Sequence, residues 1–147
     1  MEVHVRSARL TDLDAAVRIL AGGAQGERPR NDVDYLRNLL FAPAATVVVA
    51  ERERRVVGVG VLAIRPSVGS GPFVGTVDEL GTAEEPSLGA AERRRVADDI
   101  VEHLATSARN KGCTRVEVAE PLASAEPSLW KRLRFASRGR VLGRSIG

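Results

Sequence analysis

The sequence contains few cysteines, few aromatic residues and no long apolar run, and each absence argues against a class of protein or site. Its 147 residues include one cysteine, Cys113, which excludes an internal disulfide bond and a cysteine-cluster metal site. Aromatic residues make up only 3%, which argues against a stacking surface for single-stranded nucleic acid. No apolar run approaches the ~20 residues of a membrane span. Residues 1–20 carry several charges and lack the apolar segment of a signal peptide, so we expect a cytoplasmic protein.

Charge is nearly balanced, with 22 basic and 19 acidic residues and a formal net charge of +3. The basic residues are scattered along the chain, which argues against nucleic acid as a partner. All but Lys111 and Lys131 are arginines, and the planar guanidinium fork binds phosphate and carboxylate groups well. This richness in arginine fits a phosphorylated ligand, and it also fits a general compositional bias. The two histidines stand apart from any acidic motif, so we expect no metal site.

Hydrophobic periodicity predicts the element order β-α-α-β-β-β-α-β-α-β, a mixed α/β sheet with helices on its faces. The expected strands cover residues 3–7, 46–51, 56–65, 73–82, 114–119 and 138–146. Two of the expected helices begin near Asp12 and Asp32, and the others cover residues 91–111 and 124–134. No linker divides the chain, so we expect a single domain over residues 1–147.

Two glycines stand out in the second strand of the predicted central hairpin. Gly58 and Gly60 are two residues apart, so both lie on one face of that strand. Glycine weakens a strand interior, and it often marks a point where another group approaches the backbone closely. We therefore expect another group to approach the backbone closely on that face.

Three segments of the sequence match short patterns in a fixed order. Residues 6–12 follow R-x-A-x-x-x-D, and residues 46–60 contain Val-Ala-Glu followed by Val-Val-Gly-Val-Gly. Residues 133–135 are Leu-Arg-Phe, similar to the end of Y-E-K-L-G-F. In their order and spacing these segments resemble the GNAT superfamily of acetyl-CoA-dependent N-acetyltransferases. The resemblance covers nearly the whole chain and implies a mostly antiparallel central sheet flanked by helices.

The resemblance also implies a site for acetyl-CoA. In such proteins the fourth strand offers backbone amides to the pantetheine arm, and the matching residues here are Leu80, Gly81 and Thr82. The following loop and the start of the long helix then hold the pyrophosphate. Helix N-terminal amides and the helix dipole favour such an anion.

The phosphate loop of the family, R/Q-x-x-G-x-G/A, can be placed in two ways. Residues 86–91 keep the last glycine and an alanine but lose the Arg or Gln. Residues 92–97 lose the glycines and put Glu92 where an anion should bind, so we prefer the first placement. That placement implies five residues near the phosphates: Gly89, Ala90, Ala91, Arg93 and Arg94. The two arginines also fit a solvated helix start, although positive charge there opposes the helix dipole.

The last helix departs from the family at one position. Many members carry a tyrosine there that can protonate the leaving thiolate of CoA, and this chain has Trp130. An indole N–H donates a hydrogen bond but releases no proton near neutral pH. Trp130 can therefore contact the cofactor or pack in the core, but it cannot serve as a general acid.

A general base is expected where the fourth strand separates from the next one. A carboxylate with a raised pKa suits removal of a proton from an acceptor ammonium. Glu79 is the first candidate and Asp78 the second, and both also fit surface acids at a strand end. Side chains alternate along a strand, so we expect only one of the two to face the site.

The resemblance implies that the protein transfers an acetyl group from acetyl-CoA to a primary amine of a small molecule or peptide. The acceptor site is expected between residues 22–31 and 66–72, and Arg28 and Arg30 hint at an acidic group on the acceptor. The alternative is a catalytically inactive GNAT-fold protein that binds CoA or another protein. Residues 138–146 offer a strand for a homodimer.

Overall fold

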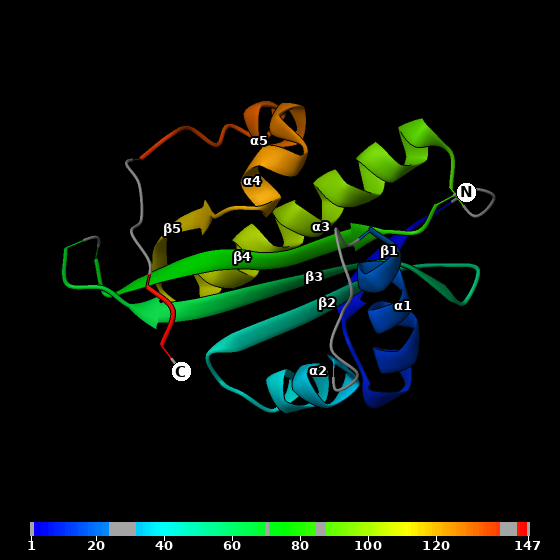
Figure 1. Ribbon diagram of the computed structural model, residues 1–147, viewed down its shortest axis with the longest axis horizontal. Coiled ribbons are helices and arrows are strands. Elements are labelled where there is room, and N and C mark those ends of the chain that lie inside the picture. The colour runs from blue at the N-terminus through cyan, green and yellow to red at the C-terminus, as the bar shows by residue number, and fades with distance from the viewer. Residues whose placement is uncertain (1, 24–31, 70, 85–87, 139–143, 147) are drawn as a thin grey trace.

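The computed structural model describes residues 2–23, 32–69, 71–84, 88–138 and 144–146, and Figure 1 shows its layers. A sheet lies between helices on its two faces, as the sequence predicted. In chain order the elements are β1 (His4–Ser7), η1 (Leu10–Asp12), α1 (Leu13–Gly23), α2 (Asp32–Leu40), β2 (Ala45–Arg52), β3 (Arg55–Pro66), β4 (Phe73–Thr82), α3 (Ala90–Asn110), β5 (Cys113–Val118), α4 (Leu122–Ala125) and α5 (Pro127–Arg132).

The sheet has five strands in the order β1-β2-β3-β4-β5. Neighbouring strands run antiparallel except β4 and β5, which are parallel. A parallel pair needs a crossover connection, and the long helix α3 supplies it. This confirms the predicted mixed, mostly antiparallel sheet. The expected last strand falls largely on residues 139–143, which lie outside the described part of the chain.

Helix α3 packs closely against β3 because Gly58 and Gly60 have no side chains on the face that it covers. A Cβ atom built at Gly60 would stand 2.5 Å from the Cγ2 atom of Ile100, and one at Gly58 would stand 2.7 Å from its Cδ1 atom. Ile100 is fully buried between them. The close approach predicted for this face is thus the packing of α3 on the sheet.

The opposite face of the sheet is covered by α1 and α2 (Figure 1). Their apolar side chains pack with Val47, Val49, Val59 and Val61 of β2 and β3. The core is therefore split by the sheet into two clusters. Among the described residues, no helix combines the length and apolar composition needed to cross a membrane.

The R-x-A-x-x-x-D segment has a structural explanation. Arg6 of β1 forms an ion pair with Asp12 at 2.7 Å and another with Glu51 of β2 at 2.6 Å. Asp12 is buried, and its carboxylate also accepts the backbone N–H of Arg9 at 2.7 Å. Arg6 therefore holds the pKa of Asp12 below its usual value. The network ties β1, β2 and the entry into α1 together.

Candidate functional site

Strands β4 and β5 separate at one end of the sheet. Their pairing ends at Val77 and Val118, after which β5 stops. Strand β4 continues for another five residues, 78–82, of which residues 79–82 pair with β3 and none pairs with β5. One edge of this stretch therefore has backbone groups that are not used by a neighbouring strand. Such an edge can form hydrogen bonds with a bound ligand.

A β-bulge lies where the two strands separate. Val77 is opposite Leu62 and Glu79 is opposite Val61, so β4 has one extra residue, Asp78. Val61 packs with the α1 and α2 side, so Glu79 faces that side too. Asp78 and Glu79 both line a cavity there. The expectation that only one carboxylate faces the site is wrong, because the bulge interrupts the regular alternation of side chains.

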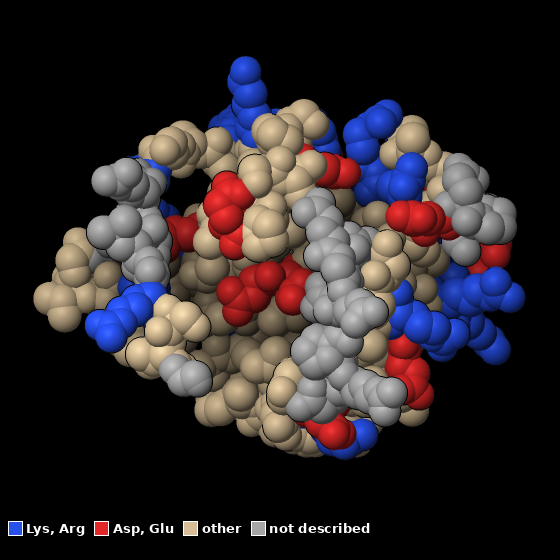
Figure 2. Space-filling view, in the orientation of Figure 1, with Lys and Arg blue, Asp and Glu red and all other residues tan. Residues whose placement is uncertain are grey.

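This cavity, which we call the acidic cavity, has a volume of about 320 Å³. Figure 2 shows acidic side chains on the floor of a hollow in the centre of the visible face. Apolar residues of α1, α2 and β3 form the walls, and one tyrosine also lines the cavity. The lining residues are Val17, Leu20, Tyr35, Leu36, Leu39, Val61, Asp78 and Glu79.

The carboxyl group of Asp78 has a pKa above its usual value, and its burial and the neighbouring carboxylate of Glu79 are the causes. Partial burial of its carboxyl group raises the pKa of Asp78, and the negative charge of Glu79 raises that pKa further. A carboxylate with a raised pKa is a better proton acceptor than an ordinary surface acid. Asp78, the second candidate from the sequence, therefore has the electrostatic environment of a general base.

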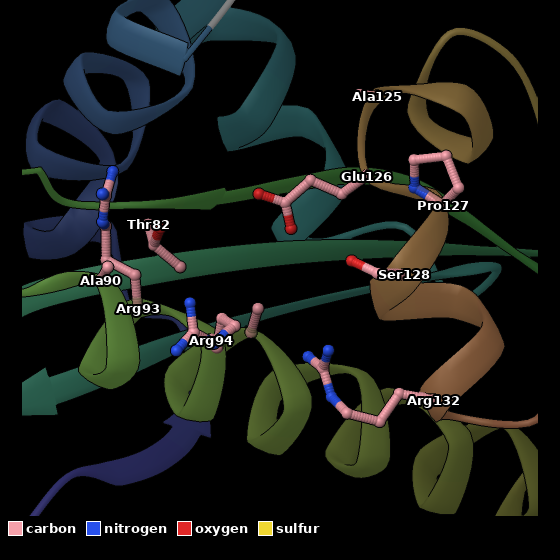
Figure 3. A pocket seen from close by; sticks show the side chains of 10 residues that line it. Thr82, Ala90, Arg93, Arg94, Ala125, Glu126, Pro127, Ser128 and Arg132 are labelled. Carbon is pink, nitrogen blue, oxygen red and sulfur yellow. The ribbon is translucent and has the colours of Figure 1, made fainter.

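A second cavity lies on the other face of the sheet, between the start of α3 and the α4–α5 segment (Figure 3). We call it the basic cavity, because three arginines line it. Its volume is about 390 Å³. The lining residues are Thr82, Ala90, Arg93, Arg94, Ala97, Ala125, Glu126, Pro127, Ser128 and Arg132. In Figure 3, Glu126 and Ser128 project from the α4–α5 side, and Arg132 reaches across to α3.

The arginines of the basic cavity differ in how far they are already paired. Arg132 forms an ion pair with Asp98 of α3 at 2.6 Å. The Nε atom of Arg93 is buried and has no hydrogen-bond partner among the described residues. A buried donor without a partner is costly, and an anionic ligand would satisfy it. Arg93 and Arg94 are therefore the cationic groups of this cavity that suit a bound phosphate.

Glu92 lies beside this cavity but not on its wall. Its carboxylate accepts the N–H of Gly89 at 3.3 Å and forms an ion pair with Arg52 at 2.7 Å. It therefore caps the first turn of α3 from the outside. Its negative charge is balanced by Arg52, and among the described lining residues of the cavity three arginines outnumber one carboxylate.

Comparison with known proteins connects these two cavities to one family. A model of the Acetyltransferase (GNAT) family matches residues 13–133, the segment that contains every residue of both cavities. The chain belongs to this family. No curated protein sequence matches the chain at a comparable level of significance.

Several solved structures are similar to this chain over nearly its whole length. A ribosomal-protein-alanine N-acetyltransferase from Brucella melitensis biovar Abortus is 22% identical with a TM-score of 0.76, over 99% of this chain and 100% of that one. A transcriptional regulator from Bacillus halodurans is 19% identical with a TM-score of 0.81, over 99% and 100%. The aminoglycoside N-acetyltransferase AAC(6')-Iy in complex with CoA is 18% identical with a TM-score of 0.78, over 99% and 95%. Identities this low establish the GNAT fold alone.

The residues present fit the phosphate groups of CoA. The basic cavity combines the first turn of a 21-residue helix, the side chains of Arg93 and Arg94, and the orphaned Nε donor. Helix N-terminal amides and guanidinium groups are the usual protein donors to phosphate. Thr82 lines the same cavity at the end of β4. Residues 85–87, part of the predicted phosphate loop, lie outside the described residues.

The other predicted cofactor residues are distributed around this cavity. Gly89 and Ala91 flank Ala90 at the start of α3, and Leu80 faces the α3 core cluster from β4. Gly81 faces the other way, since a Cβ atom there would stand 3.1 Å from the Cγ2 atom of Ile19 in α1. Its small size is therefore explained by packing against α1.

Trp130 lies in the core and does not line either cavity. Its indole N–H donates a hydrogen bond to the carbonyl oxygen of Leu122 at 3.0 Å. Its ring contacts Phe135 edge-on, with the ring centroids 5.1 Å apart. The tryptophan that replaces the family tyrosine thus connects α4, α5 and the segment that follows.

Sequence reasoning missed the contribution of Tyr35 to the acidic cavity. Tyr35 lies on α2, far in sequence from Asp78 and Glu79, and only the packing of α2 on the sheet brings them to one cavity. Most of residues 22–31, expected around the acceptor, lie outside the described residues. The described part of residues 66–72 lines neither cavity. Among the described residues, no cluster of potential metal ligands occurs.

Proposed function

We propose that this GNAT family chain transfers an acetyl group from acetyl-CoA to a primary amine. One observation supports the proposal above all others. The end of β4 that is free of β5 contributes Thr82 to a basic cavity on one face and a carboxylate pair to an acidic cavity on the other. A donor held through its phosphates and an acceptor held as an ammonium require opposite charges of this kind.

In this proposal the basic cavity binds the donor. Arg93, Arg94 and the first amides of α3 hold the phosphates, and the free edge of β4 forms hydrogen bonds with the pantetheine arm through the backbone of Leu80 and Thr82. Acetyl-CoA supplies an acyl group activated as a thioester. Binding both substrates next to the same strand end brings the reacting atoms together, which can supply much of the rate enhancement.

In the acidic cavity, Asp78 accepts a proton from the acceptor ammonium. The neutral nitrogen then attacks the thioester carbonyl and a new C–N bond forms. The C–S bond breaks, and the nitrogen loses its second proton to solvent. The thiolate leaves and takes up a proton from solvent. Glu79 contributes by attracting the ammonium and by keeping the pKa of Asp78 raised.

A direct experiment tests this function in two steps. Isothermal titration with acetyl-CoA measures donor binding, and desulfo-CoA serves as a non-reactive control. Release of free thiol during incubation with a panel of primary amines measures transfer. We expect binding and amine-dependent release, whereas no binding at millimolar acetyl-CoA would refute the proposal.

The buried position of Trp130 favours one other candidate, a CoA-binding module without transferase activity. Its N–H is held by Leu122, and no tyrosine takes its place on α5. The same experiment separates the two functions. Donor binding without thiol release on any amine would support the module.

A further inference from the structure

Tyr35 lines the acidic cavity and brings a hydroxyl group to it, and the mechanism above gives this group no role. A phenolic oxygen can donate one hydrogen bond and accept others, whereas an ionised carboxylate can only accept. The Tyr35 side chain belongs to a residue that is 53% exposed, so a ligand that enters the cavity from solvent can reach it. The cavity therefore offers a ligand polar groups of two kinds, from α2 and from β4.

The packing of α2 explains why Tyr35 lies at this position. The next residue, Leu36, is buried and packs with the valines of β2 and β3. Leu39, one turn further along the helix than Tyr35, lines the same cavity. Tyr35 therefore stands at the border between the buried face of α2 and solvent. Tyrosine suits such a border because it combines an apolar ring with a polar tip.

An acceptor ammonium has more N–H groups than Asp78 alone can use. A primary ammonium carries three, and Asp78 removes the proton of one of them in the proposed mechanism. The other two also need hydrogen-bond acceptors wherever the cavity excludes water. The volume of about 320 Å³ corresponds to roughly ten water molecules, at about 30 Å³ each. A nitrogen bound in so small a space lies near both Asp78 and the wall that Tyr35 forms.

We propose that Tyr35 binds the acceptor by accepting a hydrogen bond from the same nitrogen that Asp78 deprotonates. This hydrogen bond limits the rotation of the nitrogen and orients its lone pair for attack. The hydroxyl proton stays on the phenol throughout. The inference rests on the proposed acetyl transfer and adds an acceptor-binding residue from α2. The competing explanation is a ring that only shields the cavity from water.

Two substitutions at this position separate the hydroxyl group from the ring. Tyr35→Phe removes the oxygen and keeps the ring, and Tyr35→Leu removes both. The assay uses saturating acetyl-CoA and the primary amine that gives the fastest thiol release. We expect both variants to raise KM for this amine roughly tenfold or more, the usual loss for a hydrogen bond to a charged group. We expect kcat to stay within about threefold, because the contact is present before and during the reaction.

Asn38→Ala is the matched control for these variants. Asn38 is an exposed residue of the same helix and does not line the cavity. Its substitution should leave KM for the amine within about twofold. Titration with acetyl-CoA and thermal unfolding should give similar Kd and Tm values for all three variants and the unsubstituted chain, which shows that the fold and the donor site are intact.

Amine binding can also be followed without turnover, because the chain has one tyrosine and one tryptophan. Trp130 is buried in the core cluster on the α3 side of the sheet. The same amine, added to protein saturated with desulfo-CoA, should change the near-ultraviolet absorption of the tyrosine and leave that of the tryptophan unchanged. Tyr35→Phe should abolish this difference spectrum.

The outcomes distinguish this proposal from the function on which it rests. If Tyr35→Phe keeps the KM of the unsubstituted chain, or if the amine binds without a tyrosine difference spectrum, the role of Tyr35 is overturned and acetyl transfer still stands. A defect in Tyr35→Leu alone would likewise assign the effect to the ring. Absence of transfer to any amine would overturn both. A raised KM in both Tyr35 variants, with Asn38→Ala unchanged, would support the proposal.

Discussion

The two cavities lie on opposite faces of one sheet, and they differ in the charge that they present. The basic cavity is formed by α3 and the α4–α5 segment, and among its described lining residues three arginines outnumber one carboxylate, Glu126. The acidic cavity is formed by α1, α2, β3 and β4, and the carboxylates of Asp78 and Glu79 line it. One strand contributes to both. The sheet thus separates a site suited to phosphate from a site suited to an ammonium group.

The comparison also shows how differently the two sites depend on local sequence. The basic cavity takes the two arginines that suit a phosphate, Arg93 and Arg94, from consecutive positions in the first turns of α3. The acidic cavity depends on a bulge that brings two consecutive strand residues to one face. The first site can be altered by exchanging side chains, whereas the second also depends on backbone register.

The largest expected effect is loss of proton transfer in the acidic cavity. Replacing Asp78 by Asn removes the proposed base while keeping its shape. We expect kcat/KM to fall roughly 10²- to 10⁴-fold, the usual contribution of a general base. The affinity for acetyl-CoA, measured by titration, should stay unchanged. Asp99→Asn, an exposed carboxylate of α3, is the matched control. A variant at Asp78 that keeps its kcat/KM within twofold would exclude this role.

A smaller effect is expected in the basic cavity. Arg93→Ala removes a charged donor to phosphate, and such hydrogen bonds are worth about 1.5–3 kcal/mol. We therefore expect the Kd for acetyl-CoA to rise roughly 10- to 100-fold, with kcat at saturation unchanged. Arg95→Ala removes the same charge from an exposed position outside the cavity and should change Kd much less. Equal losses for both variants would mean a general electrostatic effect.

Packing on the two faces can be compared with two glycine substitutions. Gly60→Ala places a methyl group 2.5 Å from Ile100, which should displace α3 and cost about 1–3 kcal/mol of the free energy of unfolding. Gly81→Ala places a methyl group 3.1 and 3.2 Å from side chains of α1, which is a milder clash. Alanine also makes the unfolded chain less flexible than glycine does, and this stabilises the folded state and offsets part of the strain. Urea unfolding should therefore rank Gly60→Ala as clearly less stable. The reverse order would contradict the close packing of α3.

The smallest expected effect is a shift in the pH dependence of kcat/KM. Asp78 acts as a base only when deprotonated, so kcat/KM should rise with pH through its raised pKa. Glu79→Gln removes the neighbouring negative charge, which lowers the pKa of Asp78 and should move this acid limb to lower pH. The pH–rate profile of the two proteins measures the shift. An acid limb at the same pH in both would mean that Glu79 does not influence the base.

Much of the fold could be predicted from periodicity. The strand predicted over residues 73–82 has the bounds of β4, and the helix predicted over residues 91–111 is α3 displaced by one residue at each end. Long, regular apolar patterns carry this information. The helix predicted over residues 124–134 is two short helices, α4 and α5, and Pro127 begins the second. Proline favours the first turn of a helix, so its position marked this boundary.

The site could be predicted only in part. The carboxylates and arginines were found because residue types and a family pattern single them out. The shared orientation of Asp78 and Glu79 could not be found, because alternation is the only rule a sequence offers for a strand and the bulge breaks it. Tyr35 was missed for a different reason. It meets β4 only through tertiary packing, which leaves no trace in local spacing.

The extra residue at position 78 divides β4 into two parts with opposite phase. Up to Val77, odd-numbered side chains face α3, and after the bulge the even-numbered residues Leu80 and Thr82 do so. The first part packs in the core, and the second contributes Asp78, Glu79 and Thr82 to the two cavities while Leu80 still packs against the core. A single inserted residue thus decides which side chains of one strand reach the core and which reach the two cavities.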